Sequence, residues 1–129
     1  MRRLPQIALL PDGKRLHLQD GPIDLVIEAS GGEAEVRAAY DAAARRFTGL
    51  LDELCGELIE LRQPADPVRC TLKGVVARRM HAAVAPFAAK QFITPMAAVA
   101  GSVAEEILGA MLDAALLQRC EVAMKGAVG

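Results

Sequence analysis

Segment 92–108 combines small residues with two places where a helix can begin. Thr94 precedes Pro95, which suits the first turn of a helix, and Ser102 precedes Glu105 at the spacing of a capping box. A helix that begins at either place presents free backbone N–H groups and the positive end of its dipole, which suit a phosphate or pyrophosphate group. The residues predicted to border such a ligand are Thr94, Pro95, Met96, Ala97, Ala98, Gly101 and Ser102.

The same residues have a purely structural interpretation, in which small side chains let two helices pack closely and the capping box only caps. The two possible helix starts also place the small residues differently. If Pro95 opens the helix, the small residues are helix surface, whereas a start at Ser102 makes them a loop that faces the ligand. The sequence leaves both starts open.

Arg78, Arg79 and His81 form a second group that could bind phosphate. Two guanidinium groups beside an imidazole can clamp a phosphate through charge-assisted hydrogen bonds. The alternative is a solvated helix face whose charges are offset by nearby carboxylates.

Asp20 and Asp24 flank a Gly-Pro turn and are a weaker candidate pair for acid–base work or for a cation. A turn-forming Asp and a strand-face Asp are the commoner explanation of such residues. The three cysteines have no C-x-x-C spacing, and His17 lacks a visible ligand partner, so we predict no metal site. No phosphate-binding P-loop or Ser/His/Asp ordering is present.

Three short runs at the beginning of the chain are typical of β-strands. They cover 6–10, 15–18 and 23–29 and are separated by Pro-Asp-Gly-Lys and Asp-Gly-Pro turns. In the third run, Ile23, Leu25 and Ile27 alternate with more polar residues, so one face is expected to pack on a core. The pattern predicts an antiparallel β-meander.

The rest of the chain is mainly helical in pattern. Apolar residues at steps of three and four predict one long helix from about Val36 to Leu61, which Pro64 stops and which covers the meander. A second helix is expected over 72–85, ended by Pro86. A third runs to about Leu117, with Val103, Ile107, Ala110, Met111 and Ala114 facing inward. Residues 121–128 are weakly β-like. The predicted class is α+β, with a meander packed by a long helix and two further helices in a single domain over 1–129.

The charges are balanced, with 15 Lys and Arg against 16 Asp and Glu for a net charge of −1. Such a balance predicts no binding of nucleic acid. No apolar run approaches the roughly 20 residues that span a bilayer, and Pro5 and Gln6 interrupt the apolar run near the N-terminus. We therefore expect a cytoplasmic protein that does not enter a membrane.

Four stretches together resemble an uncharacterised family related to ApbE, the flavin transferase that moves FMN from FAD onto target proteins. They are His17-Leu-Gln-Asp-Gly-Pro-Ile-Asp-Leu-Val-Ile27, Gly74-Val-Val-Ala-Arg-Arg-Met80, Ala83-Val-Ala-Pro-Phe87 and segment 92–108. The resemblance implies an ApbE-like fold, a flavin nucleotide (FAD or FMN) bordered by 94–102 with Arg78 or Arg79 near its phosphates, and Mg²⁺ if the protein is a transferase.

The chain departs from that superfamily in two places. Val99 stands near a position where ApbE has a lysine, and no Asn-Gly-Gly-Asp-like strand follows the third helix. The resemblance therefore predicts an N-terminal half only, truncated or divergent after about Leu117. Flavin transfer would then need the missing C-terminal half.

The alternative to a phosphate-binding or flavin-binding protein is a non-catalytic half-domain. Because a domain without half of its fold exposes apolar surface, such a chain is expected to form a homo-oligomer. A truncated product without independent activity is the third possibility.

Overall fold

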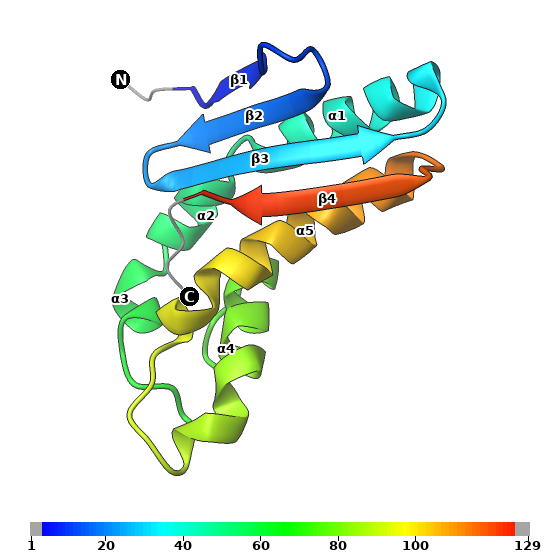
Figure 1. Ribbon diagram of the computed structural model, residues 1–129. Helices are drawn as coiled ribbons and strands as arrows, with labels where there is room; N and C mark the ends of the chain where they lie inside the picture. Colours follow the sequence, from blue (N-terminus) through cyan, green and yellow to red (C-terminus); the bar gives the residue numbers. More distant parts are fainter. Residues whose placement is uncertain (1–3, 126–129) are drawn as a thin grey trace. The chain divides into compact units, whose positions relative to one another are not determined.

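The computed structural model describes residues 4–125 and is an α+β chain with a four-stranded antiparallel sheet and several helices (Figure 1). The chain divides into two compact units. Unit 1 is Met1–Leu51 with Ala104–Gly129, and unit 2 is Asp52–Val103. The predicted α+β class is confirmed, while the single-domain organisation stays a prediction.

The sheet belongs to unit 1, and its strands follow one another in chain order. They are β1 Gln6–Leu9, β2 Arg15–Asp20, β3 Ile23–Ser30 and β4 Arg119–Met124. All three pairs of neighbours are antiparallel, so the predicted meander is confirmed. The fourth strand, β4, pairs with β3. The sequence predicted only a weakly β-like segment over 121–128, and residues 126–128 of that prediction lie outside the described part of the chain.

One face of the sheet is apolar because the residues of each strand alternate between its two sides. Leu16 and Leu18 of β2 stand opposite Ile27 and Leu25 of β3, and all four side chains are buried. Figure 1 shows α1 (Glu33–Phe47) and α5 (Val99–Ala114) behind the sheet.

Two contacts connect α5 to other elements of unit 1, one to β4 and one to α1. The thiol of Cys120 on β4 lies 3.7 Å from the sulfur of Met111 on α5. On the helices, Arg46 of α1 donates through Nε to Glu106 of α5 at 2.6 Å. The apolar face of the sheet is therefore the core of unit 1, and α1 and α5 are fastened to each other over it.

The predicted single long helix from Val36 to Leu61 is wrong. Three helices occupy this stretch: α1, α2 (Leu50–Cys55) and α3 (Leu58–Leu61). Between α1 and α2, Gly49 has φ of +88°, a left-handed conformation that ends a right-handed helix and suits glycine. The spacing of apolar residues continues across the break, so the sequence pattern predicted one helix where the structure has three.

Helix α4 (Val75–Ala88) confirms the second predicted helix but not its end. Gly74 is the residue before the helix, and Pro86 lies inside the last turn instead of ending it. Pro86 has no N–H for the bond to the carbonyl four residues earlier, yet the helix continues two residues beyond it to Ala88.

The third predicted helix begins as a short 3₁₀ turn, η1 (Pro95–Ala98), and continues as α5. Val103, Ile107 and Met111 are buried as predicted, and the helix ends at Ala114, three residues before the expected end. Ala110 and Ala114, also predicted to face inward, are only partly buried and exposed, respectively.

The stretch Pro95–Ala114 is 20 residues long and contains an 18-residue window with a mean hydropathy of 1.3, so it is long and apolar enough to cross a membrane by length and composition. Glu105, Glu106 and Asp113 interrupt it, so the expectation that no uninterrupted apolar run approaches such a length is not overturned. One helix of this kind is weak evidence for a membrane protein, since a core helix passes the same test. A cytoplasmic location stays a prediction.

Candidate functional site

Unit 2 contains a cavity of about 190 Å³ between α4 and the loop that follows α3. Its walls come from α3, the loop, the beginning of η1 and one side chain of α4. The lining residues are Glu60, Gln63, Pro64, Ala65, Asp66, Arg69, Thr71, Leu72, His81 and Pro95. The cavity therefore brings together polar groups from α3, the loop and α4, with Pro95 of η1 as an apolar part of the wall.

His81 is the most buried ionisable group of this cavity, with only 8% of its surface exposed. Its Nε2 lies 2.8 Å from the backbone oxygen of Asp66. Because a carbonyl oxygen only accepts, Nε2 carries the proton in this bond, and in the neutral ring Nδ1 is then an acceptor. His81 thus fixes the loop to α4 and keeps one ring nitrogen for another donor.

The loop itself is held by the carboxylate of Asp66. Its Oδ1 accepts hydrogen bonds from the backbone N–H groups of Val68 (2.8 Å) and Arg69 (2.9 Å). These two hydrogen bonds lower the pKa of Asp66, and the bond from the Arg69 N–H has the larger effect. A further backbone bond, from Ala65 to the oxygen of Ile93 at 2.8 Å, ties the loop to the segment before η1.

Two glutamates hold the remaining wall and the start of α4. Glu60 accepts a hydrogen bond from the Thr71 hydroxyl at 2.9 Å. Glu57 accepts from the backbone N–H groups of Lys73 (2.6 Å) and Gly74 (2.9 Å). The N-terminus of α4 is consequently capped by a carboxylate of the chain itself.

The structure does not bring Arg78, Arg79 and His81 together as a clamp. Arg78 is exposed and is not among the cavity-lining residues. Arg79 donates through Nη1 to the backbone oxygen of Ser102 at 3.2 Å, which fastens α4 to α5. Of the three, only His81 lines the cavity, because consecutive helical residues point in different directions.

The helix start in segment 92–108 is the one at Thr94 and Pro95. Thr94 is the N-cap residue of η1 without a side-chain cap bond, and Pro95 is its first residue. Ser102 is buried inside α5, so the predicted capping box with Glu105 is wrong. The alternative that places a ligand-facing loop over these residues is therefore wrong as well.

Of the residues predicted to border a ligand in this segment, Pro95 alone lines the cavity. The others, Thr94, Met96, Ala97, Ala98, Gly101 and Ser102, do not. Ala97 and Gly101 are exposed helix surface, and a Cβ added at Gly101 would meet nothing within 4 Å. No close approach of a ligand or a neighbouring helix requires this glycine.

Arg69, Thr71, Glu60 and Asp66 were missed by sequence reasoning. The loop between α3 and α4 was interpreted only as the end of a helix, because it contains two prolines. The Asp-Pro pair at 66–67 was the available signal, since an Asp before such a turn commonly accepts bonds from backbone N–H groups two and three residues later.

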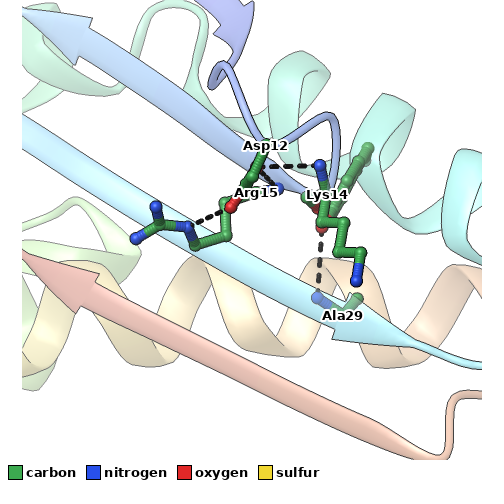
Figure 2. Close-up of polar contacts among 5 residues, drawn as sticks. Asp12, Lys14, Arg15 and Ala29 are labelled. Carbon is green, nitrogen blue, oxygen red and sulfur yellow. Dashed lines mark hydrogen bonds and ion pairs between the residues drawn. The ribbon is translucent and has the colours of Figure 1, made fainter.

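A second polar cluster lies in unit 1 at the turn between β1 and β2 (Figure 2). Asp12 accepts hydrogen bonds from the backbone N–H groups of Lys14 (2.9 Å) and Arg15 (3.0 Å) and from Arg15 Nε (2.6 Å). Led by the bond from Lys14, these interactions lower the pKa of Asp12 to about 2. The exposed carboxylate is saturated with donors from its own turn, so it serves the fold.

The hydroxyl of Tyr40 on α1 bridges β2 and β3 beside this turn. It donates to the backbone oxygen of Lys14 and accepts from the backbone N–H of Ala29 at 3.1 Å. Lys14 and Ala29 are the pair that follows the last paired residues of the two strands, so the hydroxyl replaces the next bond of the ladder. Burial is the main cause that raises the pKa of Tyr40.

Asp20 and Asp24 lie on opposite faces of the sheet, so they cannot act as a pair. Asp20 stands opposite Ile23 on the apolar side, whereas Asp24 stands opposite Gln19 on the other side. There, Asp24 Oδ1 lies 2.6 Å from His17 Nε2, a contact that the sequence did not suggest. In the described range, 4–125, no group of three or more His, Cys, Asp or Glu side chains is placed to hold a metal ion.

The family model described as AbpE bacteria matches residues 7–126, and the chain belongs to this family. No curated protein and no solved structure matches the chain. The match overturns the resemblance to the ApbE flavin transferases, because AbpE bacteria is a different family and no comparison points to ApbE. The match also extends over β4, so the expected divergence after Leu117 is wrong.

Proposed function

We propose that this member of the AbpE bacteria family binds a small phosphate-bearing ligand in the cavity of unit 2 beside His81. The observation that carries the proposal is that His81, Arg69 and Pro95 line one cavity although they come from three separate stretches. The guanidinium of Arg69 favours an anion, and the second ring nitrogen of His81 accepts a hydrogen bond from a hydroxyl group of the ligand.

The size of the cavity favours a phosphate-sized group over a whole nucleotide. About 190 Å³ accommodates a few polar heavy-atom groups, since a water molecule takes about 30 Å³ of liquid. Ordinary small-molecule sites begin at roughly 300 Å³. The cavity therefore supports binding of a phosphate group, with the remainder of the ligand outside it.

The carboxylates in the wall define the ligand further. Asp66 already accepts two backbone N–H bonds, and Glu60 accepts the Thr71 hydroxyl, so part of their negative charge is compensated within the protein. The second oxygen of Glu60 favours a donor on the ligand. A phosphate monoester whose alcohol carries neighbouring hydroxyl groups satisfies both demands, with the phosphate toward Arg69 and a hydroxyl toward Glu60.

Flavin binding, a Mg²⁺ requirement and transferase activity were expected from the ApbE resemblance alone. With that resemblance overturned, no contact among the described residues supports them. They stay predictions, and the proposal names only a phosphate-bearing ligand.

The two histidines of the chain make the test direct. Titration with inorganic phosphate at millimolar concentration, followed by the imidazole NMR signals, should shift the ring signals of His81 and leave those of His17 unchanged. His17 lies in unit 1 and serves as the internal control. Equal shifts at both histidines, or none at His81, would contradict the proposal.

A matched pair of arginine variants assigns the effect to the cavity. Arg69→Ala should weaken phosphate binding about tenfold, because it removes a charge-assisted hydrogen bond worth about 1.5 kcal/mol or more. Arg62→Ala is the control, since Arg62 is also exposed but lies outside the cavity wall. An equal loss in both variants indicates non-specific attraction and would refute the site.

A further inference from the structure

The two edges of the sheet in unit 1 differ in their protection against other strands. An unpaired edge presents free N–H and C=O groups, and natural proteins usually place charges on it. β4 carries Arg119 and Glu121, and Lys125 follows it directly. β1 consists of Gln6, Ile7, Ala8 and Leu9 and has no charge within 4–11.

The apolar face of the sheet continues onto β1 although no described part of the chain buries it there. Ile7 pairs with Leu18 and Leu9 with Leu16, so both stand on the apolar side. Leu16 and Leu18 are buried, whereas Ile7 is 41% and Leu9 is 56% exposed. An open groove of about 740 Å³ borders Leu9 and Leu16 on this side. The apolar face is therefore incompletely covered at β1, the strand whose edge carries no charge.

The direction of the free backbone groups on β1 follows from the ladder. The N–H of Leu10 donates to the oxygen of Arg15 on the β2 side at 2.8 Å. Because the directions of the backbone N–H and C=O groups alternate along a strand, those of Ala8 and Gln6 also point toward β2. The backbone groups of Ile7 and Leu9 point outward. The two exposed apolar residues thus also carry the free hydrogen-bonding groups.

We propose that β1 pairs antiparallel with β1 of a second copy of this chain, about a twofold axis at Ala8. In this register Ile7 of one copy stands opposite Leu9 of the other, and each such pair exchanges two backbone hydrogen bonds. A register centred on Ile7 instead places Leu9 opposite Pro5, which has no N–H to donate. The Ala8-centred register is therefore the one that uses the free groups fully.

A second copy suits this edge for two reasons. Self-pairing brings no like charges together, because residues 4–11 carry none. It also places the apolar pair Ile7 and Leu9 twice on the same face, which extends the buried surface across the twofold axis. The product is a continuous eight-stranded sheet with helices on one side, formed from two four-stranded sheets.

Charges introduced at this uncharged edge test the pairing. The variants Ile7→Glu with Leu9→Glu and Ile7→Lys with Leu9→Lys should each be monomeric in analytical ultracentrifugation, at concentrations where the wild-type chain is a dimer. When mixed, they should form a one-to-one heterodimer, since the Glu side chains of one copy then stand opposite the Lys side chains of the other. Both positions are partly exposed, so neither variant is expected to unfold, which circular dichroism verifies.

The matched control is Ile59→Glu, which changes an equally apolar residue that is 81% exposed and lies in unit 2. It should leave the dimer unchanged. A monomeric wild-type chain, a dimer that survives both edge variants, or a dimer broken equally by Ile59→Glu would each overturn the proposal. A monomeric wild type would also mean that a different protein, or nothing, occupies the edge.

Discussion

Unit 1 and unit 2 satisfy their backbone groups in different ways. In unit 1, four strands provide most partners for one another, and side chains such as Tyr40 and Asp12 complete the ladder only where it ends. In unit 2, short helices and a long loop have no ladder, so Glu57 and Asp66 accept the backbone N–H groups. Polar side chains therefore gather around a cavity in unit 2 and stay dispersed in unit 1.

The difference suggests where each unit carries its function. A sheet whose inner groups are paired has unused hydrogen-bonding capacity at its edges, which favours contacts with other strands. A loop held by side chains concentrates charged and polar groups in one place, which favours a small ligand. Mutations that affect one unit and spare the other measure how independent these two arrangements are.

The largest effect is expected from Phe47→Ala in the core of unit 1. The ring is fully buried, so its loss should lower the free energy of unfolding by about 3–5 kcal/mol. Urea denaturation followed by circular dichroism measures the change. Ile59→Ala, at an exposed position, should change the free energy of unfolding by no more than about 0.5 kcal/mol. A small effect of Phe47→Ala would mean that unit 1 is not the stable core of the chain.

Glu57→Ala should break the carboxylate cap of α4 in unit 2. The loss of an N-terminal cap costs about 1–2 kcal/mol, and here the N–H groups of Lys73 and Gly74 lose their acceptor. Hydrogen exchange at the Gly74 amide should accelerate while exchange in β2 and β3 stays slow. In Glu57→Gln, which keeps one acceptor oxygen, the exchange rate at the Gly74 amide should lie between the rates of the wild type and of Glu57→Ala. Unchanged exchange at Gly74 would refute the capping role.

Tyr40→Phe should have a smaller effect, confined to unit 1. Removing the hydroxyl leaves the Lys14 oxygen and the Ala29 N–H without their bridge, at a cost of about 1 kcal/mol. The Ala29 amide should exchange faster, and the Ala65 amide of unit 2 should not change. Equal acceleration in both units would mean that the hydroxyl stabilises more than the strand ends.

The smallest effect is expected from acid titration of Asp12. Its pKa is about 2 in the folded chain, below the value of about 3.9 in an unfolded chain. The charged carboxylate therefore stabilises the fold at neutral pH, and this stabilisation is lost as the pH falls from about 4 through about 2. Carboxyl NMR should show one group titrating near pH 2 that is absent from Asp12→Asn. A midpoint near 4 would contradict the turn geometry.

The first three strands could be predicted from the sequence because their signals are local. Ile23, Leu25 and Ile27 alternate with polar residues, and the turns contain Asp12 and Gly13. The long helix was predicted wrongly because its apolar period continues across Gly49, whose backbone conformation periodicity does not report. Pro86 was predicted to end the second helix, but α4 continues past it to Ala88.

The candidate site could be predicted only in part. His81 and Pro95 were singled out from the sequence, and both line the cavity. Arg69 and Thr71 were not, because they lie in a loop without periodicity whose shape depends on the carboxylates of Asp66 and Glu60. Arg79 was predicted as a ligand group, yet it donates to the backbone of Ser102, a contact that requires two helices to meet.

The sequence by itself determined the β-meander, the existence of α4 and α5, and the helix start at Pro95 as one of two choices. These features depend on neighbouring residues, whose alternation, turn chemistry and capping act over a few positions. Tertiary structure alone decided that β4 completes the sheet beside β3 and that His81 reaches the loop at Asp66. Those contacts join distant positions, and their free energy comes from packing that no local pattern encodes.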